Sequence, residues 1–202
     1  RAGRAGRVGP GRCLRLWARE AVLEDFTPPE VTREELDDLL LAAAAAGTPV
    51  TDLAFPDPLP EHALERAWQR LRAMAAIDAD GRLTDHGRRL FPLPLDPLFA
   101  HLITAMPDTV TTAAMTDLAA ALTVDRPLLG PVRGEQAREA LKDWLPEADD
   151  ALLQIRLVRM DPPREVPVNR AGVKEARRIA DQVRQALDLP GRSADAPLPR
   201  AE

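Results

Sequence analysis

Prolines and glycines divide the second half of the chain into short segments whose apolar residues recur at helical spacing. We expect helices near residues 95–106, 109–123, 133–145, 149–160 and 169–189. The last of them begins at Asn169, a residue type favoured at N-caps, and stops before Pro190 and Gly191. Because 45% of the 202 residues are hydrophobic, these helices can bury a sizeable core. The sequence therefore predicts a mainly α fold, followed by a disordered tail after Gly191.

The predicted helix 169–189 has one apolar face and one basic face. The basic face carries Arg170, Lys174, Arg177, Arg178 and Arg184. Cations in such a stripe can bind the phosphates of a nucleic acid. Since Glu175 and Asp181 are interleaved with them, a solvated surface is the simpler interpretation, and the sequence leaves both open.

The first half of the chain contains two further helices and a small hairpin. One helix is predicted from Thr32, a suitable N-cap, to Gly47, a C-cap residue type. Another spans residues 61–76, and an Asp-Gly pair between apolar neighbours predicts a tight hairpin at residues 77–83. Thr84 is placed to cap a short helix after the hairpin. This order of elements is typical of a degenerate winged helix.

Three arginines recur at every third position of the first seven residues, with a glycine before the second and the third. On a helix, Arg1, Arg4 and Arg7 would share one broad face. Gly3 and Gly6 would each cost a helix ~1 kcal/mol relative to alanine, which suggests that backbone and ligand approach closely there. Arginine binds phosphate oxygens through a planar, permanently charged fork. The heptad therefore predicts an anion-binding stripe, and a flexible arm that touches nucleic acid non-specifically stays open as the alternative.

Charge is unevenly spread along the chain. The net charge is −5, but residues 1–20 are strongly basic and residues 24–61 strongly acidic. A basic N-terminal segment followed by an acidic segment favours a local anion-binding site over a surface that binds anions non-specifically.

The sequence lacks the motifs typical of several other kinds of functional site. His62, His86 and His101 have no ligand spacing with one another or with Cys13, so no metal site is expected. The chain has no Gly-x-x-x-x-Gly-Lys-Ser/Thr phosphate loop and no Asp-Glu-x-His motif. It has no signal peptide and no apolar run of ~18 residues, so no membrane partner is expected. The single cysteine excludes an internal disulfide and fits a reducing cytoplasm.

The arginine heptad and the residues after it resemble a helicase motif. Arg1, Gly3, Arg4, Gly6 and Arg7 match motif VI of superfamily 2 helicases, whose pattern is Gln-Arg-x-Gly-Arg-x-Gly-Arg. A short strand is expected at residues 12–17, and this segment resembles the strand that follows motif VI in the DEAH-box branch. Only the leading Gln is absent, so we expect a C-terminal fragment that begins inside motif VI.

The region after residue 27 resembles the same family. Residues 83–88 (Leu-Thr-Asp-His-Gly-Arg) and 93–97 (Leu-Pro-Leu-Asp-Pro) fit its pattern Leu-Thr-x-x-Gly-Arg followed by Leu-Pro-x-x-Pro. Among bacterial branches, HrpB-type helicases look most similar, because of residues 15–17 and the compact linker. The resemblance implies four parts: the end of a second RecA-like α/β lobe (1–26), a degenerate winged-helix domain (27–94), a helical ratchet-like bundle (95–190) and a disordered tail (191–202).

The resemblance also implies a site and partners. Arg4 and Arg7 would be catalytic residues that contact the γ-phosphate of ATP, and Gly3 and Gly6 would let this segment approach the nucleotide. ATP and Mg²⁺ would be bound mainly by a first RecA-like lobe in cis, so this chain alone is expected to be inactive. The expected partner is a single-stranded nucleic acid. The resemblance favours RNA, and the sequence itself leaves the choice between RNA and DNA open. The expected compartment is the cytoplasm. The alternative is a non-enzymatic winged-helix regulator with a basic N-terminal arm.

Overall fold

The structure is a computed structural model, and it describes residues 4–18, 20–22, 35–146 and 149–197. The helices are α1 (Asp37–Ala45), α2 (Glu61–Ala73), α3 (Asp85–Leu90), α4 (Pro97–Thr104), α5 (Thr109–Leu122), α6 (Glu135–Trp144), α7 (Asp150–Arg159) and α8 (Arg170–Ala186), with a 3-10 turn, η3, at Val50–Asp52. Within the described ranges, β structure is limited to two isolated bridges, so the predicted mainly α fold is confirmed.

Local capping signals in the sequence explain where several helices begin and end. The Thr84 hydroxyl accepts a hydrogen bond from the Gly87 N–H at 3.0 Å, and the Asn169 side chain accepts one from Gly172 N–H at 3.0 Å. After α1, Gly47 adopts a φ of +69°, the left-handed conformation that ends helices. All five helices predicted after residue 95 are confirmed, with bounds shifted by a few residues. The predicted N-cap Thr32 lies outside the described residues.

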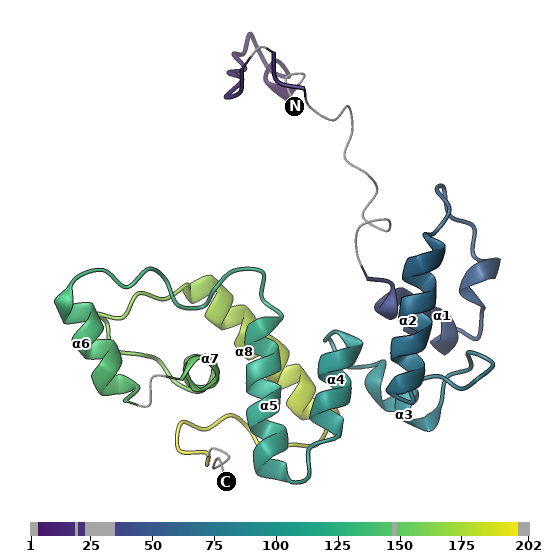
Figure 1. The fold of residues 1–202 in the computed structure, drawn as a ribbon. Coiled ribbons are helices and arrows are strands. Elements are labelled where there is room, and N and C mark those ends of the chain that lie inside the picture. The colour runs from purple at the N-terminus through teal and green to yellow at the C-terminus, as the bar shows by residue number, and fades with distance from the viewer. Residues whose placement is uncertain (1–3, 19, 23–34, 147–148, 198–202) are drawn as a thin grey trace.

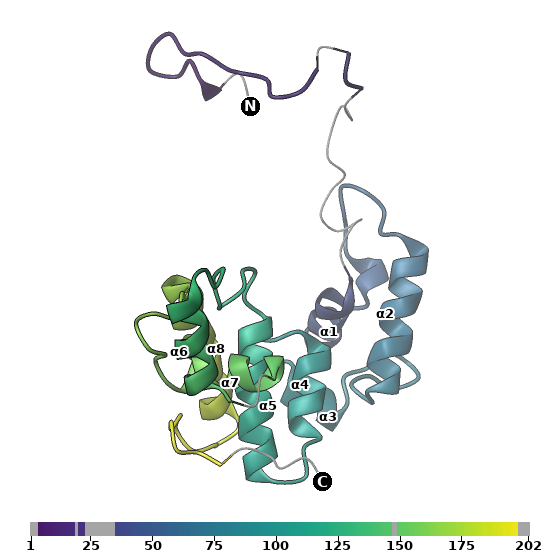
Figure 2. The ribbon, with the colours of Figure 1, turned by 60° about the vertical axis from the view of Figure 1, so that its left-hand side comes forward.

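The helices share one apolar core that runs through both halves of the molecule. At one end α1 packs against α2, and at the other end α5 packs against α7 and α8 (Figure 1). Helix α4 contacts α1, α3 and α5 and so joins the two halves, as the turned view also shows (Figure 2). Fully buried side chains in both halves belong to the same cluster, among them Leu71, Ile103, Leu157 and Val183.

The described residues at the start of the chain differ from the sequence prediction. Arg4 lies in a 3-10 turn and residues 5–9 form turns and bends, so no α-helix is present among residues 4–9, and residues 12–17 are not a strand. A Cβ atom on Gly11 would lie 1.7 Å from the Ala5 carbonyl oxygen, so the chain folds back on itself here. Leu14 and Leu16 are 85% and 93% exposed. A strand of a parallel sheet needs neighbouring strands for its hydrogen bonds, and the described chain supplies none.

The tail also differs from its prediction over the part that the structure describes. Arg192 pairs with Asp181 on α8 at 2.7 Å, and Arg159 on α7 donates to the Ala196 carbonyl at 2.9 Å. Residues 191–197 are thus tied to α7 and α8 where disorder was expected, and residues 198–202 lie outside the described ranges. None of the helices described here has the length and apolar character needed to cross a membrane.

Candidate functional site

The arginine heptad is only partly described. Arg1 and Gly3 lie outside the described residues, while Arg4 and Arg7 are exposed and make no hydrogen bond or ion pair with any described residue. A Cβ atom on Gly6 would meet nothing closer than the Gly9 carbonyl oxygen at 4.0 Å. The described structure therefore brings these arginines to no other charged group, and their role in ATP hydrolysis stays a prediction.

The predicted hairpin at residues 77–83 is fixed to α2 by aromatic and cationic contacts. A single antiparallel bridge joins Ile77 to Leu83. Gly81, in the turn, has a φ of +78°, and a Cβ atom there would lie 2.1 Å from the Trp68 ring. The Arg72 guanidinium stacks on the same ring, 5.2 Å from its centre. Only glycine suits this turn, which confirms the importance of the Asp-Gly pair.

The Leu-Thr-x-x-Gly-Arg motif has a structural explanation. Besides capping α3, the Thr84 hydroxyl donates to the Ala75 carbonyl at 2.6 Å. Gly87 lies so close to the preceding loop that a Cβ atom would fall 2.1 Å from the Ala76 carbonyl oxygen. Arg88 donates to the Leu83 carbonyl at 3.1 Å. These residues fix how the hairpin leads into α3.

A Gly87→Ala substitution is expected to destabilise the chain by about 1–3 kcal/mol, because the new methyl group must displace backbone rather than a flexible side chain. Urea unfolding of the purified chain measures this effect. Gly191→Ala is the matched control and should stay within about 0.5 kcal/mol, since a Cβ atom there meets nothing within 4 Å. Equal stability of the two variants would contradict the close approach at Gly87.

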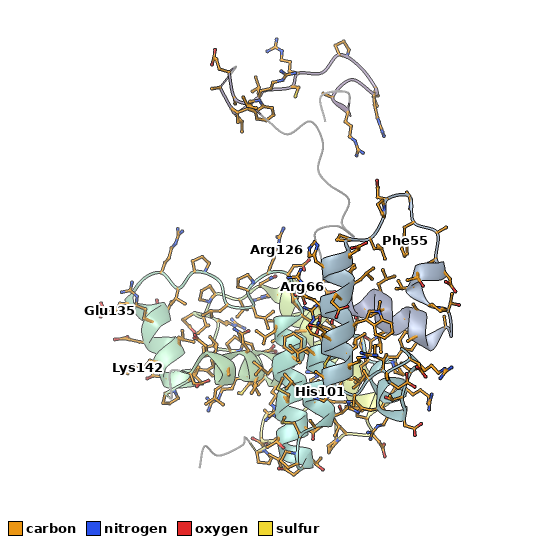
Figure 3. All side chains as sticks on the ribbon, turned by 45° about the vertical axis from the view of Figure 1, so that its right-hand side comes forward. Phe55, Arg66, His101, Arg126, Glu135 and Lys142 are labelled. Atoms are coloured by element: carbon orange, nitrogen blue, oxygen red, sulfur yellow. The ribbon has the colours of Figure 1, made fainter. Side chains whose placement is uncertain are left out.

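His86 and His101 form a pair that the sequence did not predict. His86 Nε2 lies 2.9 Å from His101 Nδ1, and the rings meet edge to face (His101 is labelled in Figure 3). Burial lowers the pKa of His86, and the neighbouring His101 and Arg89 lower it further. His86 is therefore a half-buried residue that joins α3 to α4 through its contact with His101. Within the described residues, no group of three or more His, Cys, Asp or Glu is arranged to hold a metal ion.

Two of the five cations predicted on the solvated face of α8 are structural. Arg184 is only 4% exposed. Arg177 donates to the carbonyls of Leu157 and Val158 at 3.2 and 3.0 Å, and it pairs with Asp161 at 2.9 Å. These contacts tie α8 to the C-terminal end of α7. The prediction of one continuous solvated face is therefore wrong at both positions.

The remaining cations of α8 stay at the surface. Arg178 pairs with Glu175 at 3.6 Å. Arg170 and Lys174 are exposed and have no carboxylate partner among the described residues. Together with Arg164 from the preceding loop, they line a cavity of about 540 Å³.

The loop that carries Arg164 is held in place by a second segment of backbone. Gly130 N–H donates to the Pro167 carbonyl at 2.9 Å, and Asn169 N–H donates to the Leu128 carbonyl at 2.8 Å. Val166, in the same loop, is 3% exposed. The cavity wall is therefore fixed by hydrogen bonds and burial.

The helical half also contains a buried charge network that the sequence analysis missed. Asp117 on α5 is fully buried and accepts hydrogen bonds from Arg159 Nε on α7 at 2.6 Å and from Arg184 Nη2 on α8 at 2.7 Å. A signal for it was present, because Asp117 is the only charged residue within an otherwise apolar, Thr-containing helix. We call Asp117, Arg159 and Arg184 the buried triad.

Comparisons with known proteins identify the family. No family model matches the chain. The chain is 32% identical over 161 residues to the pre-mRNA-splicing factor ATP-dependent RNA helicase prp22 of Schizosaccharomyces pombe, a match that covers 76% of this chain and 14% of that protein. The chain belongs to the DEAH-box helicase family.

The fold agrees with this membership. A crystal structure of the E. coli DExH-box NTPase HrpB is similar, with a TM-score of 0.60 and 22% sequence identity, over 96% of this chain and 20% of that one. This similarity shows the fold alone. The chain spans only 14% and 20% of the lengths of these two proteins.

Proposed function

We propose that this DEAH-box chain is the C-terminal part of an ATP-dependent RNA helicase. The observation that carries the proposal is its 32% identity, over 161 residues, to a protein named as an ATP-dependent RNA helicase. ATP and Mg²⁺ would be bound mainly by a first RecA-like lobe in cis, because this chain has no phosphate loop and no Asp-Glu-x-His motif. The cytoplasm is its proposed compartment.

In this proposal the arginine heptad completes the ATP site. Arg4 and Arg7 would contact the γ-phosphate, and Gly3 and Gly6 would let the segment approach the nucleotide. Two observations support these roles. Both arginines are exposed without a partner among the described residues, and the space around Gly6 is open. Guanidinium groups that are not already paired can neutralise charge on a transferring phosphoryl group.

The rest of the chain would close a channel around single-stranded RNA. Residues 27–94 would act as the winged helix and residues 95–190 as the ratchet-like bundle, with residues 1–26 ending the second RecA-like lobe. The shared core across α1, α4 and α5 supports this, because it lets the two parts move together when the lobes close.

The winged-helix regulator is not favoured by the comparisons, and the geometry of α2 weakens it further. Its recognition helix would need free cations. Arg70 instead pairs with Asp37, and Arg72 donates to the carbonyl of Ala79 in the hairpin. Arg66 is then the one arginine of α2 that makes no hydrogen bond or ion pair with a described residue.

The proposal predicts that ATPase activity requires the first lobe. The purified 202-residue chain, mixed with ATP, Mg²⁺ and single-stranded RNA, should release no phosphate above background. A longer polypeptide in which a first RecA-like lobe precedes this sequence should show RNA-stimulated release. RNA-stimulated phosphate release by the chain alone, or none by the longer polypeptide, would contradict the proposal.

A further inference from the structure

We propose that the cavity at the start of α8 binds the phosphodiester backbone of single-stranded nucleic acid. We call it the α8 phosphate pocket, and Arg164, Arg170 and Lys174 are its three ligand-binding cations. The inference rests on the proposed function in one respect, since the helicase's own strand is taken as the occupant.

The pocket gathers three cations that form no ion pair with any described residue. Asp161 is the one acid that lines it, and its carboxylate is paired with Arg177 at 2.9 Å. Arg164, Arg170 and Lys174 make no ion pair with any described residue. The chain as a whole is acidic, with a net charge of −5. A cluster of three unpaired cations on such a chain attracts anions at one place rather than over the whole surface.

The pocket is also preorganised. Arg170 and Lys174 are one helical turn apart on the same face of α8, about 6 Å along its axis. Arg164 is carried by the loop that Gly130 and Asn169 hydrogen-bond in place. A site whose backbone is already fixed loses less conformational entropy when it binds.

The walls between these cations are apolar. Pro162, Pro163, Val166, Val168 and Val173 line the same cavity. Apolar walls lower the local dielectric constant, which strengthens the attraction between the cations and a bound phosphate. The two arginine forks suit phosphate oxygens better than a point charge would. A phosphodiester backbone is therefore the proposed ligand, and an acidic polypeptide is the competing occupant that the experiment tests.

The test measures binding of a fluorescent oligouridylate to the full 202-residue chain by anisotropy, over a series of salt concentrations. The pocket variant is Arg164→Gln/Arg170→Gln/Lys174→Gln. The matched control is Arg133→Gln/Arg138→Gln/Lys142→Gln, which removes two arginines and one lysine, all exposed, on and just before α6 (Lys142 is labelled in Figure 3). Both triple variants have the same net charge. A difference between their RNA affinities therefore depends on where the cations lie and not on total charge.

We expect the pocket variant to bind RNA about tenfold to a hundredfold more weakly at low salt, and the control to bind nearly as well as the unchanged chain. Each phosphate contact contributes about 0.7 to the slope of log K against log salt for a single strand, so three lost contacts should reduce the slope by about 2. All the replaced side chains are exposed, and unfolding curves will check that the variants fold. If the pocket variant fails to fold, Arg164→Gln/Lys174→Gln should reduce the slope by about 1.4.

Several outcomes would overturn the inference. They are equal losses in the pocket and control variants, no loss in the pocket variant, or no RNA binding by the unchanged chain. Competition by polyglutamate as strong as that by unlabelled RNA would assign the pocket to an acidic polypeptide instead. Competition by inorganic phosphate alone, at the same phosphate concentration as the RNA, would assign it to a free anion. None of these results depends on ATPase activity. The proposed helicase function can therefore be correct even if the pocket does not bind RNA, and the pocket can bind RNA even if the proposed ATPase function is wrong.

Discussion

Replacing Arg7 with alanine in the longer helicase polypeptide is expected to lower kcat for ATP hydrolysis by about 10³–10⁵-fold. This is the usual contribution of an arginine that neutralises the charge developing on a transferring phosphoryl group. Arg7→Lys should lower kcat nearly as much, because lysine keeps the positive charge but lacks the planar guanidinium group. Nucleotide affinity should fall much less than turnover, since the interaction strengthens mainly in the transition state. Arg4 variants should behave similarly.

Steady-state ATPase assays with saturating RNA, together with a nucleotide titration, measure these effects. Arg12→Ala and Arg15→Ala are the controls. Both residues are exposed and lie in the same segment, but outside the glycine-spaced heptad, so their loss should change turnover little. Near-normal turnover in Arg7→Ala would remove the proposed role of this arginine. Losses of similar size in the controls would indicate a general need for positive charge in this segment.

The features that the sequence predicted well depend on short stretches of chain. The N-caps at Thr84 and Asn169 each involve an N–H three residues further on, so the residues needed to recognise them are adjacent in sequence. The same holds for Gly47 after α1 and for the hairpin turn at Gly81, where only the local backbone conformation matters. Helical periodicity then placed all the helices after residue 95.

The features that the sequence analysis missed depend on contacts between segments that are distant in the sequence. Residues 12–17 have the composition of a strand, but a strand forms only against a neighbour, and the described chain offers none. His86 and His101 lie on different helices, so their contact could not be read from spacing. Arg184 shares a helix face with exposed cations, and only the packing of α5 against α8 shows that it is buried.

The candidate site divides in the same way. Motif resemblance placed Arg4 and Arg7, but the described residues bring no other charged group to them. The α8 phosphate pocket was partly foreseen in Arg170 and Lys174. Arg164 could not have been added from sequence, because it reaches the pocket only through the pairing of its loop with residues 128–130.

The second large effect is expected at the buried triad. Asp117→Asn should destabilise the chain by about 3–5 kcal/mol, because it keeps the side-chain volume but leaves Arg159 and Arg184 buried without a counter-charge. Folded domains are stable by only about 5–15 kcal/mol, so this is a large part of the total. Urea or thermal unfolding of the purified chain measures the loss. Asp181→Asn is the matched control, because its pair with Arg192 is much more exposed and should contribute at most about 1 kcal/mol.

A further variant separates the charge of the triad from its connections to the backbone. Buried ion networks can often be replaced by apolar residues of similar size without loss of stability. In this protein Arg159 also donates to the carbonyl of Ala196, and Arg184 to those of Ala113 and Pro190. Asp117→Leu/Arg159→Met/Arg184→Met removes the buried charge but leaves these carbonyls without their donors, so it should recover only part of the loss. Full recovery of the free energy of unfolding would show that the triad matters only because its charges neutralise one another, and that its hydrogen bonds to the backbone carbonyls add nothing. A cost for Asp117→Asn no larger than that for Asp181→Asn would show that the triad does not hold α5, α7 and α8 together.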